Sequence, residues 1–564
     1  MIDSHFHLWT EDTTTPDKRA DRADQVRGEM AKQGVDRICL IGEVGQTIEA
    51  CYEANRTVAK FQAKHPDIFY GWARVDPRLG EEAVEEFKRA VQEDGLIGLK
   101  HHFLGTPVNI ADPEFFPLVE AAIEMDVPII AHVMERHSDD KHRWDETEAY
   151  SEDVAALAER YPELTLISGH IGAGGFWEKR IKTIESYDNV YLDTSGSNTE
   201  TDVLEMAAER LGVDRLVYGT DTWLLPGVGK LEGAELTPEE KAEIAYNMER
   251  LIPTSTPNKL SEAELEDGIE RSVEHFRERA KPREETIVDA NAYVGNWAFR
   301  DVDATPDDLV SMMDRKGVDK AVVSSLESAM YRNVHAGNRR LHEALEESCH
   351  RDRLIPFATI NPTYPAWESD LEECVEEFGM QGVRLLPLYH DYDIDNPAVT
   401  ALMDKCVELD VPVMFIATLE DQRGRHPCVN LRDFEGNAKH WGEDHGDAIV
   451  SQLKKSPEAD VIIANGWAIA ERVKRETTES YPNGVRMNNQ VRSGETVFVL
   501  DDLFMHFAYQ GENIVETIGV DRLVTGPKMP LLVFDAHYKY TEHLPVEDEE
   551  RERIASGNIL SLLE

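Results

Sequence analysis

The stretch Ile2-Asp3-Ser4-His5-Phe6-His7 opens the chain and predicts a β-strand whose two faces differ in chemistry. Successive side chains of a strand point to opposite faces, so His5 and His7 share one face with Asp3. Two imidazoles one pleat apart can bind one metal ion. An ordinary strand with two surface histidines would give the same short pattern, so the rest of the chain has to decide between the two interpretations.

Short apolar runs rich in β-branched residues alternate with helical-period segments through the first half of the chain. This alternation is typical of repeated βα units around a parallel sheet. The runs that follow the opening strand are 37–42, 69–75, 96–100, 128–132, 165–170, 190–194 and 216–221. Eight strands, each followed by a helix, predict a closed (β/α)₈ barrel of the TIM type.

The second half of the chain repeats the first. Leu211-Gly-Val-Asp-Arg-Leu-Val217 returns as Ile518-Gly-Val-Asp-Arg-Leu-Val524, and Asp126-Val-Pro128 returns as Asp410-Val-Pro412. A polar segment with several prolines lies between the two copies and is typical of a linker. We therefore predict an α/β protein made of two tandem TIM-type (β/α)₈ barrels. Its parts are a first barrel in 1–252, a linker in 253–285 and a second barrel in 286–564.

Acidic residues greatly outnumber basic ones. The chain has 59 Lys and Arg against 109 Asp and Glu, a formal net charge of −50, which argues against nucleic acid or an anionic membrane as a partner. Carboxylates crowded on helix faces are typical of salt-loving organisms, although ordinary acidic cytosolic proteins also have them. The six cysteines form no CxxC pair, and we find neither a signal peptide nor a long apolar run. We expect a soluble, cytoplasmic protein.

Polar side chains fall at the C-terminal ends of the predicted strands, which is the edge where barrels of this kind place their chemistry. They are His5 and His7 after the first strand, Lys100 and His102 after the fourth, His132 after the fifth, His170 after the sixth and Asp221 after the eighth. A single strand histidine is more often a core or rim residue with an ordinary hydrogen-bond partner. So many at one edge predict a single functional site.

The motifs around these residues resemble those of the amidohydrolase superfamily, in its amidohydrolase-2 branch, whose members are similar to aminocarboxymuconate semialdehyde decarboxylase. The motifs are Asp3-Ser-His5-Phe-His7, Gly98-Leu-Lys100-His-His102, Pro128-Ile-Ile-Ala-His132, Ser168-Gly-His170-Ile-Gly172, Leu192-Asp-Thr-Ser195 and Tyr218-Gly-Thr-Asp221. The resemblance implies a distorted TIM barrel with one divalent metal ion, commonly Zn²⁺, bound by His5, His7, His132 and Asp221. It also implies a catalytic role for His170 beside the metal. Mn²⁺ and Fe²⁺ tolerate the same ligands.

Such a ligand set would leave an open position on the metal for water or substrate. A bound water with its pKa lowered to about 7 supplies hydroxide at neutral pH, and His170 could relay its proton. Asp221 could act both as a ligand and as the acceptor that orients the water. Lys100, His102 and Arg74 are candidate contacts for a small substrate, and for Lys100 a purely structural ion pair is an equal alternative.

Three functions are compatible with this site. We expect a metal-dependent hydrolase that acts on an amide, lactone or related bond of a small carboxylic-acid-like substrate, because hydroxide activation is the commonest use of such a site. Non-oxidative decarboxylation is the alternative, since the metal ligands do not separate the two reactions. A non-catalytic metal-binding scaffold is a second alternative.

In the second half the predicted metal ligands have been replaced. Asn291 and Tyr293 correspond to His5 and His7, Ile416 to His132, Lys528 to Asp221, and Asn465 or Gly466 to His170, depending on the register. Because a lysine in place of a metal-binding carboxylate repels a cation, we expect no metal in the second barrel. We expect the second barrel to pack on the first, to contribute loops to it, or to bind an anionic ligand through Lys528 and Arg384. The chain could also form a homo-oligomer.

Overall fold

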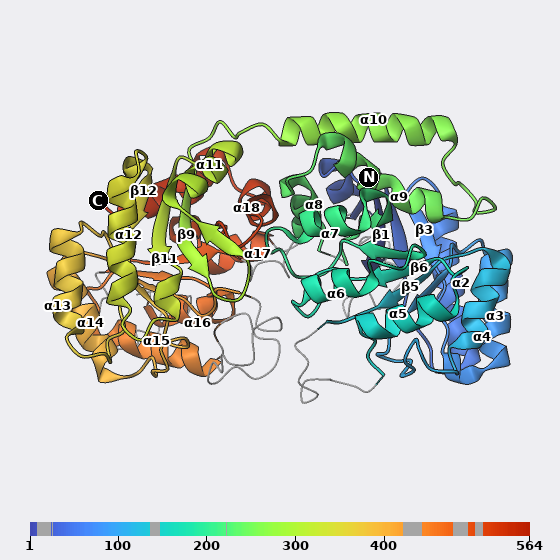
Figure 1. Cartoon of the computed structure of the whole chain (residues 1–564), viewed down its shortest axis with the longest axis horizontal. Coiled ribbons are helices and arrows are strands. Elements are labelled where there is room, and N and C mark those ends of the chain that lie inside the picture. Colours follow the sequence, from blue (N-terminus) through green and yellow to red (C-terminus); the bar gives the residue numbers. More distant parts are fainter. Residues whose placement is uncertain are drawn as a thin grey trace, which may run out of the picture. The chain divides into compact units, whose positions relative to one another are not determined.

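The structure is a computed structural model that describes residues 1–7, 24, 26–135, 147–221, 223–420, 441, 443–477, 494–501 and 511–564. It divides into two compact units, Met1–Arg279 and Ala280–Glu564. In each unit helices surround parallel strands (Figure 1). Within the described residues, no helix is both long and apolar enough to cross a membrane.

Each of the eight apolar runs of the first half overlaps a strand. The strands are β1 (Ile2–His7), β2 (Arg37–Ile41), β3 (Phe69–Trp72), β4 (Leu99–His101), β5 (Ile129–His132), β6 (Leu166–Gly169), β7 (Val190–Asp193) and β8 (Leu216–Val217). All neighbouring pairs are parallel, as the βα alternation predicts. The mixed α/β class and the parallel strand order therefore agree with the sequence.

The strand pairing does not form the single closed ladder that the sequence predicts. The strands form two ladders, β1-β2-β3 and β4-β5-β6-β7-β8, because β4 and β8 at the open edges are only three and two residues long. Individual backbone hydrogen bonds join these edges. The amide of Lys100 donates to Ala73 O at 2.9 Å, and the amides of Ser4 and Asp221 donate to Tyr218 O at 2.8 Å and to His5 O at 2.7 Å.

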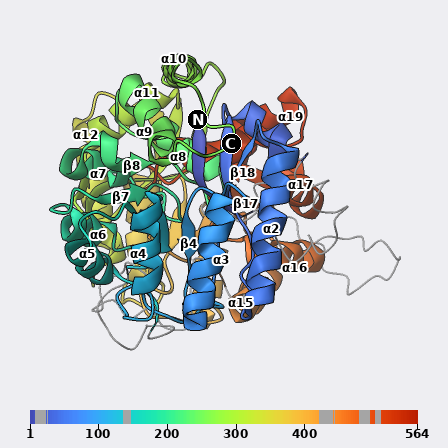
Figure 2. The same ribbon diagram turned by 90° about the vertical axis from the view of Figure 1, so that its right-hand side faces the viewer.

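Helices cover the outside of the first unit. They are α2 (Ile48–Lys64), α3 (Glu81–Gln92), α4 (Phe116–Met125), α5 (Ser151–Arg160), α6 (Trp177–Ile184), α7 (Val203–Leu211), α8 (Leu224–Gly233), α9 (Pro238–Leu251) and α10 (Glu262–Arg279). Figure 2 shows α2, α3 and α4 side by side. On α3, Ala83, Phe87 and Ala90 recur at helical spacing and are buried, so one apolar stripe holds the helix against the strands.

Part of the segment predicted as a linker belongs to the first unit. Helix α10 lies within the predicted range 253–285 and packs on α9. Gly268 of α10 faces Tyr246 of α9 so closely that an added Cβ would lie 2.6 Å from the phenolic oxygen. The absence of a side chain at this position is what allows the two helices to approach. The boundary between the two units follows Arg279.

The second unit has a similar order of elements, with β10 added and two short strands, β12 and β13, where the first unit has β3. Its strands are β9 (Val288–Trp297), β10 (Val302–Ala304), β11 (Lys320–Ser325), β12 (Leu354–Pro356), β13 (Ala358–Thr359), β14 (Val383–Leu385), β15 (Val413–Phe415), β16 (Val461–Ile463), β17 (Thr496–Leu500) and β18 (Leu523–Thr525). The added strand β10 pairs antiparallel with β9, and all other pairs are parallel. The helices around them include α11 (Pro306–Lys316), α12 (His335–Glu347), α14 (Pro397–Glu408), α15 (Glu443–Lys455), α16 (Trp467–Thr477), α17 (Gly511–Ile518) and α18 (Phe534–His543).

Strand pairing decides which residue of the second unit corresponds to His170. Leu166 pairs with Ile129, and Val461 pairs with Val413 in the same way, so His170 corresponds to Asn465 and not to Gly466. The backbone agrees, because His170 and Asn465 both have a left-handed conformation, with φ of 67° and 54°. The two units thus share a strained backbone position that few residues adopt readily.

Candidate functional site

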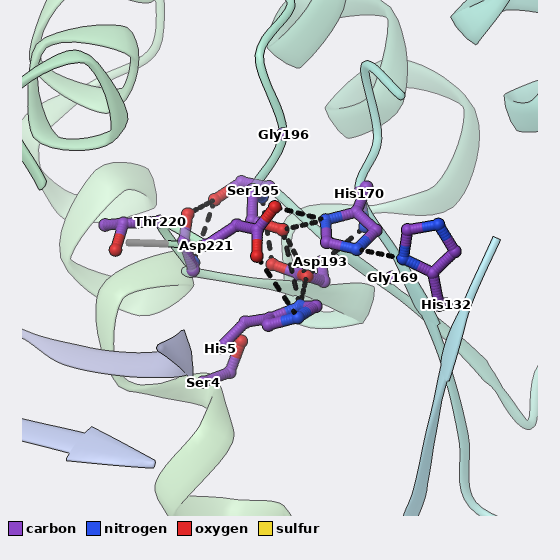
Figure 3. Close-up of polar contacts among 12 residues, drawn as sticks. Ser4, His5, His132, Gly169, His170, Asp193, Ser195, Gly196, Thr220 and Asp221 are labelled. Atoms are coloured by element: carbon purple, nitrogen blue, oxygen red, sulfur yellow. Dashed lines mark hydrogen bonds and ion pairs between the residues drawn. The ribbon is translucent and has the colours of Figure 1, made fainter. Parts of the chain in front are cut away.

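The ends of β1 and β8 bring His5, His7 and Asp221 together. Asp221 Oδ1 lies 3.7 Å from His5 Nε2 and 3.6 Å from His7 Nε2, and the three donor atoms form one compact group. Figure 3 shows His5 and Asp221 turned toward each other. Donor atoms that share one ion at about 2.1 Å in a tetrahedral site are about 3.4 Å apart, so this spacing suits a divalent cation.

His5 is held in place by Asp193, which lies at the end of β7. The Asp193 Oδ2 atom lies 2.6 Å from His5 Nδ1, and both side chains are fully buried. A carboxylate that accepts the Nδ1 proton leaves the Nε2 lone pair directed at a metal, an arrangement common around bound ions. Ser195 Oγ donates to the same Asp193 oxygen at 2.6 Å. Both residues belong to the motif Leu192-Asp-Thr-Ser195, but the prediction from sequence gave neither a role in the site, although Asp193 satisfies the strand-end criterion that selected the others.

His170 lies at the centre of a second group of polar side chains (Figure 3). Its Nε2 atom is 2.8 Å from His132 Nδ1, and its Nδ1 atom is 2.9 Å from Ser195 Oγ and 3.5 Å from Asp221 Oδ2. The structure thus places the predicted catalytic histidine beside the candidate metal site. His132, predicted as a ligand, contacts His170 here and is not part of the compact group of His5, His7 and Asp221.

Arg180 of α6 supports the left-handed turn at His170. Its guanidinium donates to the carbonyl oxygens of His170 and, at 3.0 and 2.9 Å, of Gly169 and Val133. These carbonyls lie at the ends of β5 and β6, so one fully buried side chain ties both strand ends together. No local pattern in the sequence marks Arg180, because its role depends on the approach of α6 to the strand ends.

The predicted substrate contacts also lie at this edge. Lys100 Nζ is buried and 2.9 Å from His5 Nε2, and within the described part of the chain it forms no ion pair with a carboxylate. Arg74 donates to Gly42 O at 3.1 Å, while its Nε atom has no hydrogen-bond partner among the described residues. The ring of His102 lies 3.9 Å from that of His132. This edge of the first unit, which we call its mouth, therefore carries two buried cations, Lys100 and Arg74. Neither forms an ion pair with a carboxylate of the described residues.

Burial sets the protonation of the site. It lowers the pKa values of His5, His7, His132 and His170 well below the ordinary value, and repulsion from Lys100 adds to the effect. Neutral imidazole is the form that binds metals. Burial also raises the pKa of Asp221 and lowers that of Lys100, while their mutual attraction opposes both shifts. A bound divalent cation would favour the ionised form of Asp221.

Gly219 permits the close packing behind the site, and its replacement provides a prediction. A Cβ at Gly219 would lie 2.2 Å from Asp193 Oδ1 and 2.9 Å from Ser4 Oγ, so Gly219→Ala must displace the carboxylate that orients His5. We expect a loss of about 1–3 kcal/mol in the free energy of unfolding and weaker metal binding. Chemical denaturation and metal titration measure the two effects.

The control for this prediction is Gly28→Ala. Gly28 is in a helical segment, and a Cβ added there would have no atom of the described residues within 4 Å beyond its own helix and chain neighbours. Alanine at this position is expected to be neutral or to stabilise by about 0.5–1 kcal/mol, because glycine weakens helices. Equal stability and equal metal affinity of Gly219→Ala and Gly28→Ala would contradict the role assigned to Gly219.

This cluster of histidines and carboxylates at strand ends is a candidate metal site, and sequence comparison identifies the family of the chain. A sequence model of the amidohydrolase family matches residues 2–268 and again residues 263–564. The chain therefore belongs to the amidohydrolase family, and both halves are copies of the same family domain. The resemblance inferred from the motifs is confirmed.

Several curated relatives are named as decarboxylases. Gamma-resorcylate decarboxylase from Polaromonas sp. strain JS666 is 28% identical over 214 residues, which cover 31% of this chain and 65% of the relative. The enzyme of the same name from Rhizobium sp. strain MTP-10005 is 26% identical over 217 residues, which cover 31% of this chain and 66% of the relative. The chain thus spans about two thirds of the length of these relatives. The names of these relatives favour the decarboxylase alternative. The expected hydrolase activity is therefore wrong.

Solved structures with similarity to the chain carry related names. Dihydroxybenzoic acid decarboxylase from Polaromonas sp. JS666, with bound manganese and the inhibitor 2-nitroresorcinol, is 23% identical, covers 44% of this chain and 96% of its own, and has a TM-score of 0.35. The 5-carboxyvanillate decarboxylase from Sphingomonas paucimobilis is 18% identical, covers 44% of this chain and 98% of its own, and has a TM-score of 0.35.

Proposed function

We propose that the first unit is a divalent-metal-dependent, non-oxidative decarboxylase of a small carboxylic acid. One observation carries the proposal: the metal-binding group of His5, His7 and Asp221 lies directly beside the buried ammonium of Lys100, which has no carboxylate partner among the described residues. A cation site and an unpaired cation together form a place for a carboxylate substrate. The names of the curated relatives support decarboxylation as the reaction.

The residues present fit a divalent ion. His5, His7 and Asp221 would hold it, and His132 stands nearby, against His170. Imidazole and carboxylate donors suit Zn²⁺ and Mn²⁺ alike. The ion would supply positive charge that binds and polarises the oxygen atoms of the substrate. Asp193 supports the fit, because it holds the His5 ring so that Nε2 faces the site.

The protein's own side chains would orient the substrate and move the proton. Lys100 and Arg74 would bind the leaving carboxylate and hold it close to His5. Decarboxylation breaks the bond from the ring or chain carbon to the carboxylate, leaves the electron pair on that carbon and places a proton there, so that carbon dioxide departs. His170 and Asp221, 3.5 Å apart, form the pair that can hold this proton and deliver it.

We propose a hydroxylated aromatic carboxylate as the substrate class. The relatives take their name from gamma-resorcylate, and an electron-rich ring accepts a proton at the carbon that bears the carboxylate. We further propose that each unit closes into a (β/α)₈ barrel through the backbone hydrogen bonds between its ladders. The second unit would carry no metal, because Lys528 and Ile416 stand where Asp221 and His132 stand in the first.

The test is a panel of mono- and dihydroxybenzoates incubated with the metal-loaded protein. We expect release of carbon dioxide together with the matching phenol from at least one member, and no release after treatment with a chelator. Amide and lactone analogues serve as the comparison set. A protein that holds metal but releases carbon dioxide from no member of the panel, or that hydrolyses the analogues instead, would contradict the proposal.

A further inference from the structure

The mouth of the second unit has the positions of the first unit's candidate metal site but the opposite charge. Asn291 and Tyr293 of β9 stand at the positions of His5 and His7, and Lys528, with φ of 65°, stands at that of Asp221, with φ of 54°. The three residues of the second unit are buried. Two imidazoles and a carboxylate, which attract a cation, have become an amide, a phenol and an ammonium. Such groups attract an anion.

Arg384 of β14 adds a second buried cation at the position of Lys100. Its Nη1 and Nη2 atoms donate to Ala292 O and Val322 O, both at 2.8 Å, and its Cζ atom lies 4.4 Å from the centre of the Tyr293 ring. The side chain is fully buried, and no ion pair joins it to a carboxylate of the described residues. The Asp289 carboxylate attracts Arg384 only from beyond ion-pair distance, and a buried charge without a close counter-charge is costly, so a negatively charged neighbour would stabilise this arrangement.

Three buried donors in this region have no hydrogen-bond partner among the described residues: Arg384 Nε, Asn291 Nδ2 and Thr359 Oγ1. Thr359 is the register partner of Arg384 on the neighbouring parallel strand, so both side chains project from the same face. Asn291 uses its Oδ1 atom to accept a hydrogen bond of 2.9 Å from Tyr293, on whose ring Arg384 lies. Asn291 and Arg384 thus both contact Tyr293, and Thr359 lies beside Arg384 on the neighbouring strand.

The nearby carboxylate does not supply the missing acceptor. Asp289 Oδ1 accepts the amide of Asn291 at 2.9 Å, and Oδ2 accepts the amide of Met529 at 3.1 Å. Both oxygens are thus engaged by the backbone. An unsatisfied buried donor costs about 1–3 kcal/mol. A single acceptor shared by all three would remove this cost.

We propose that the second unit binds a small monovalent anion between Arg384, Asn291 and Thr359, at the place that corresponds to the metal site of the first unit. The ligand is a halide or a carboxylate as small as formate, because the strands that carry the three donors also carry the packed apolar core, to which Leu386 and Ile416 belong. The duplicated domain would thus keep an ion at this place while reversing its sign.

Hydrogen–deuterium exchange of the full-length protein tests the site. Sodium chloride and sodium formate are titrated separately against sodium gluconate at constant ionic strength. We expect chloride, formate or both to slow exchange in 288–294 and 383–386 with a saturable dependence, while gluconate has no effect and the peptide 1–7 of the first unit does not respond. Protection by chloride alone assigns a halide site, and protection by formate assigns a carboxylate site. No saturable protection by either anion overturns the proposal.

Thr359→Val separates a binding role from a structural one. The backbone amide and carbonyl of Thr359 are already paired with Asn338, so valine keeps these bonds and the shape of the side chain while it removes only the hydroxyl. We expect the variant to fold and to bind the anion about five- to tenfold more weakly, the loss of one hydrogen bond. An unchanged titration would overturn the proposal, because the hydroxyl would then make no contact with the ion.

Discussion

His5→Ala is expected to remove the bound metal from the protein and to lower decarboxylation by at least about a thousandfold, since a metal ion contributes several kcal/mol to such a reaction. His5 is the residue on which the site converges. Its Nε2 atom faces Asp221 at 3.7 Å, its Nδ1 atom faces Asp193 at 2.6 Å, and its side chain is fully buried. Alanine removes one ligand and one of the hydrogen-bond partners of the Asp193 carboxylate.

Metal analysis by mass spectrometry and assay of carbon dioxide release are the two measurements. The matched control is Asn291→Ala, at the corresponding position of the second unit, which should keep the metal content and the activity of the wild-type protein. If His5→Ala retained one tightly bound metal per chain, or if Asn291→Ala lost it, the assignment of the metal to the first unit would be wrong.

Lys100→Met is expected to raise KM about a hundredfold, with a smaller effect on kcat. The ammonium is buried and has no carboxylate partner among the described residues, so a substrate carboxylate would complete a charge-assisted pair whose loss costs several kcal/mol. Metal affinity should hold or increase, because Lys100 Nζ lies 2.9 Å from His5 Nε2 and repels a cation bound there.

A raised KM together with an unchanged or increased metal affinity distinguishes a substrate-binding role of Lys100 from a structural one. Steady-state kinetics gives KM and kcat, and titration with a metal-buffered solution gives the affinity. Lys60→Met, on the exposed face of α2, is the control that changes the same charge far from the mouth. A Lys100→Met protein with unchanged KM, or with weakened metal binding and reduced stability, would show that the lysine only supports the fold.

Much of the site could be predicted from the chain because strand geometry is local. Alternation along a strand places His5 and His7 on one face, and the strand-end rule gathers Lys100, His102, His170 and Asp221 at one edge. The same rule could have found Asp193 and Ser195. The strand-end rule could not have found Arg180, because a helix residue that binds three strand-end carbonyls is recognised only when the position of the helix is known.

The sequence by itself determined the class of the fold, the duplication and the replacement of the predicted metal ligands in the second half, because periodicity, repeats and residue identity can all be read along one chain. Only the tertiary structure decided that Asn465 corresponds to His170, that His132 contacts His170, and that Thr359 lies in register with Arg384. These relations depend on strand register and on contacts between residues distant in sequence. Packing sets such relations, and no local pattern encodes them.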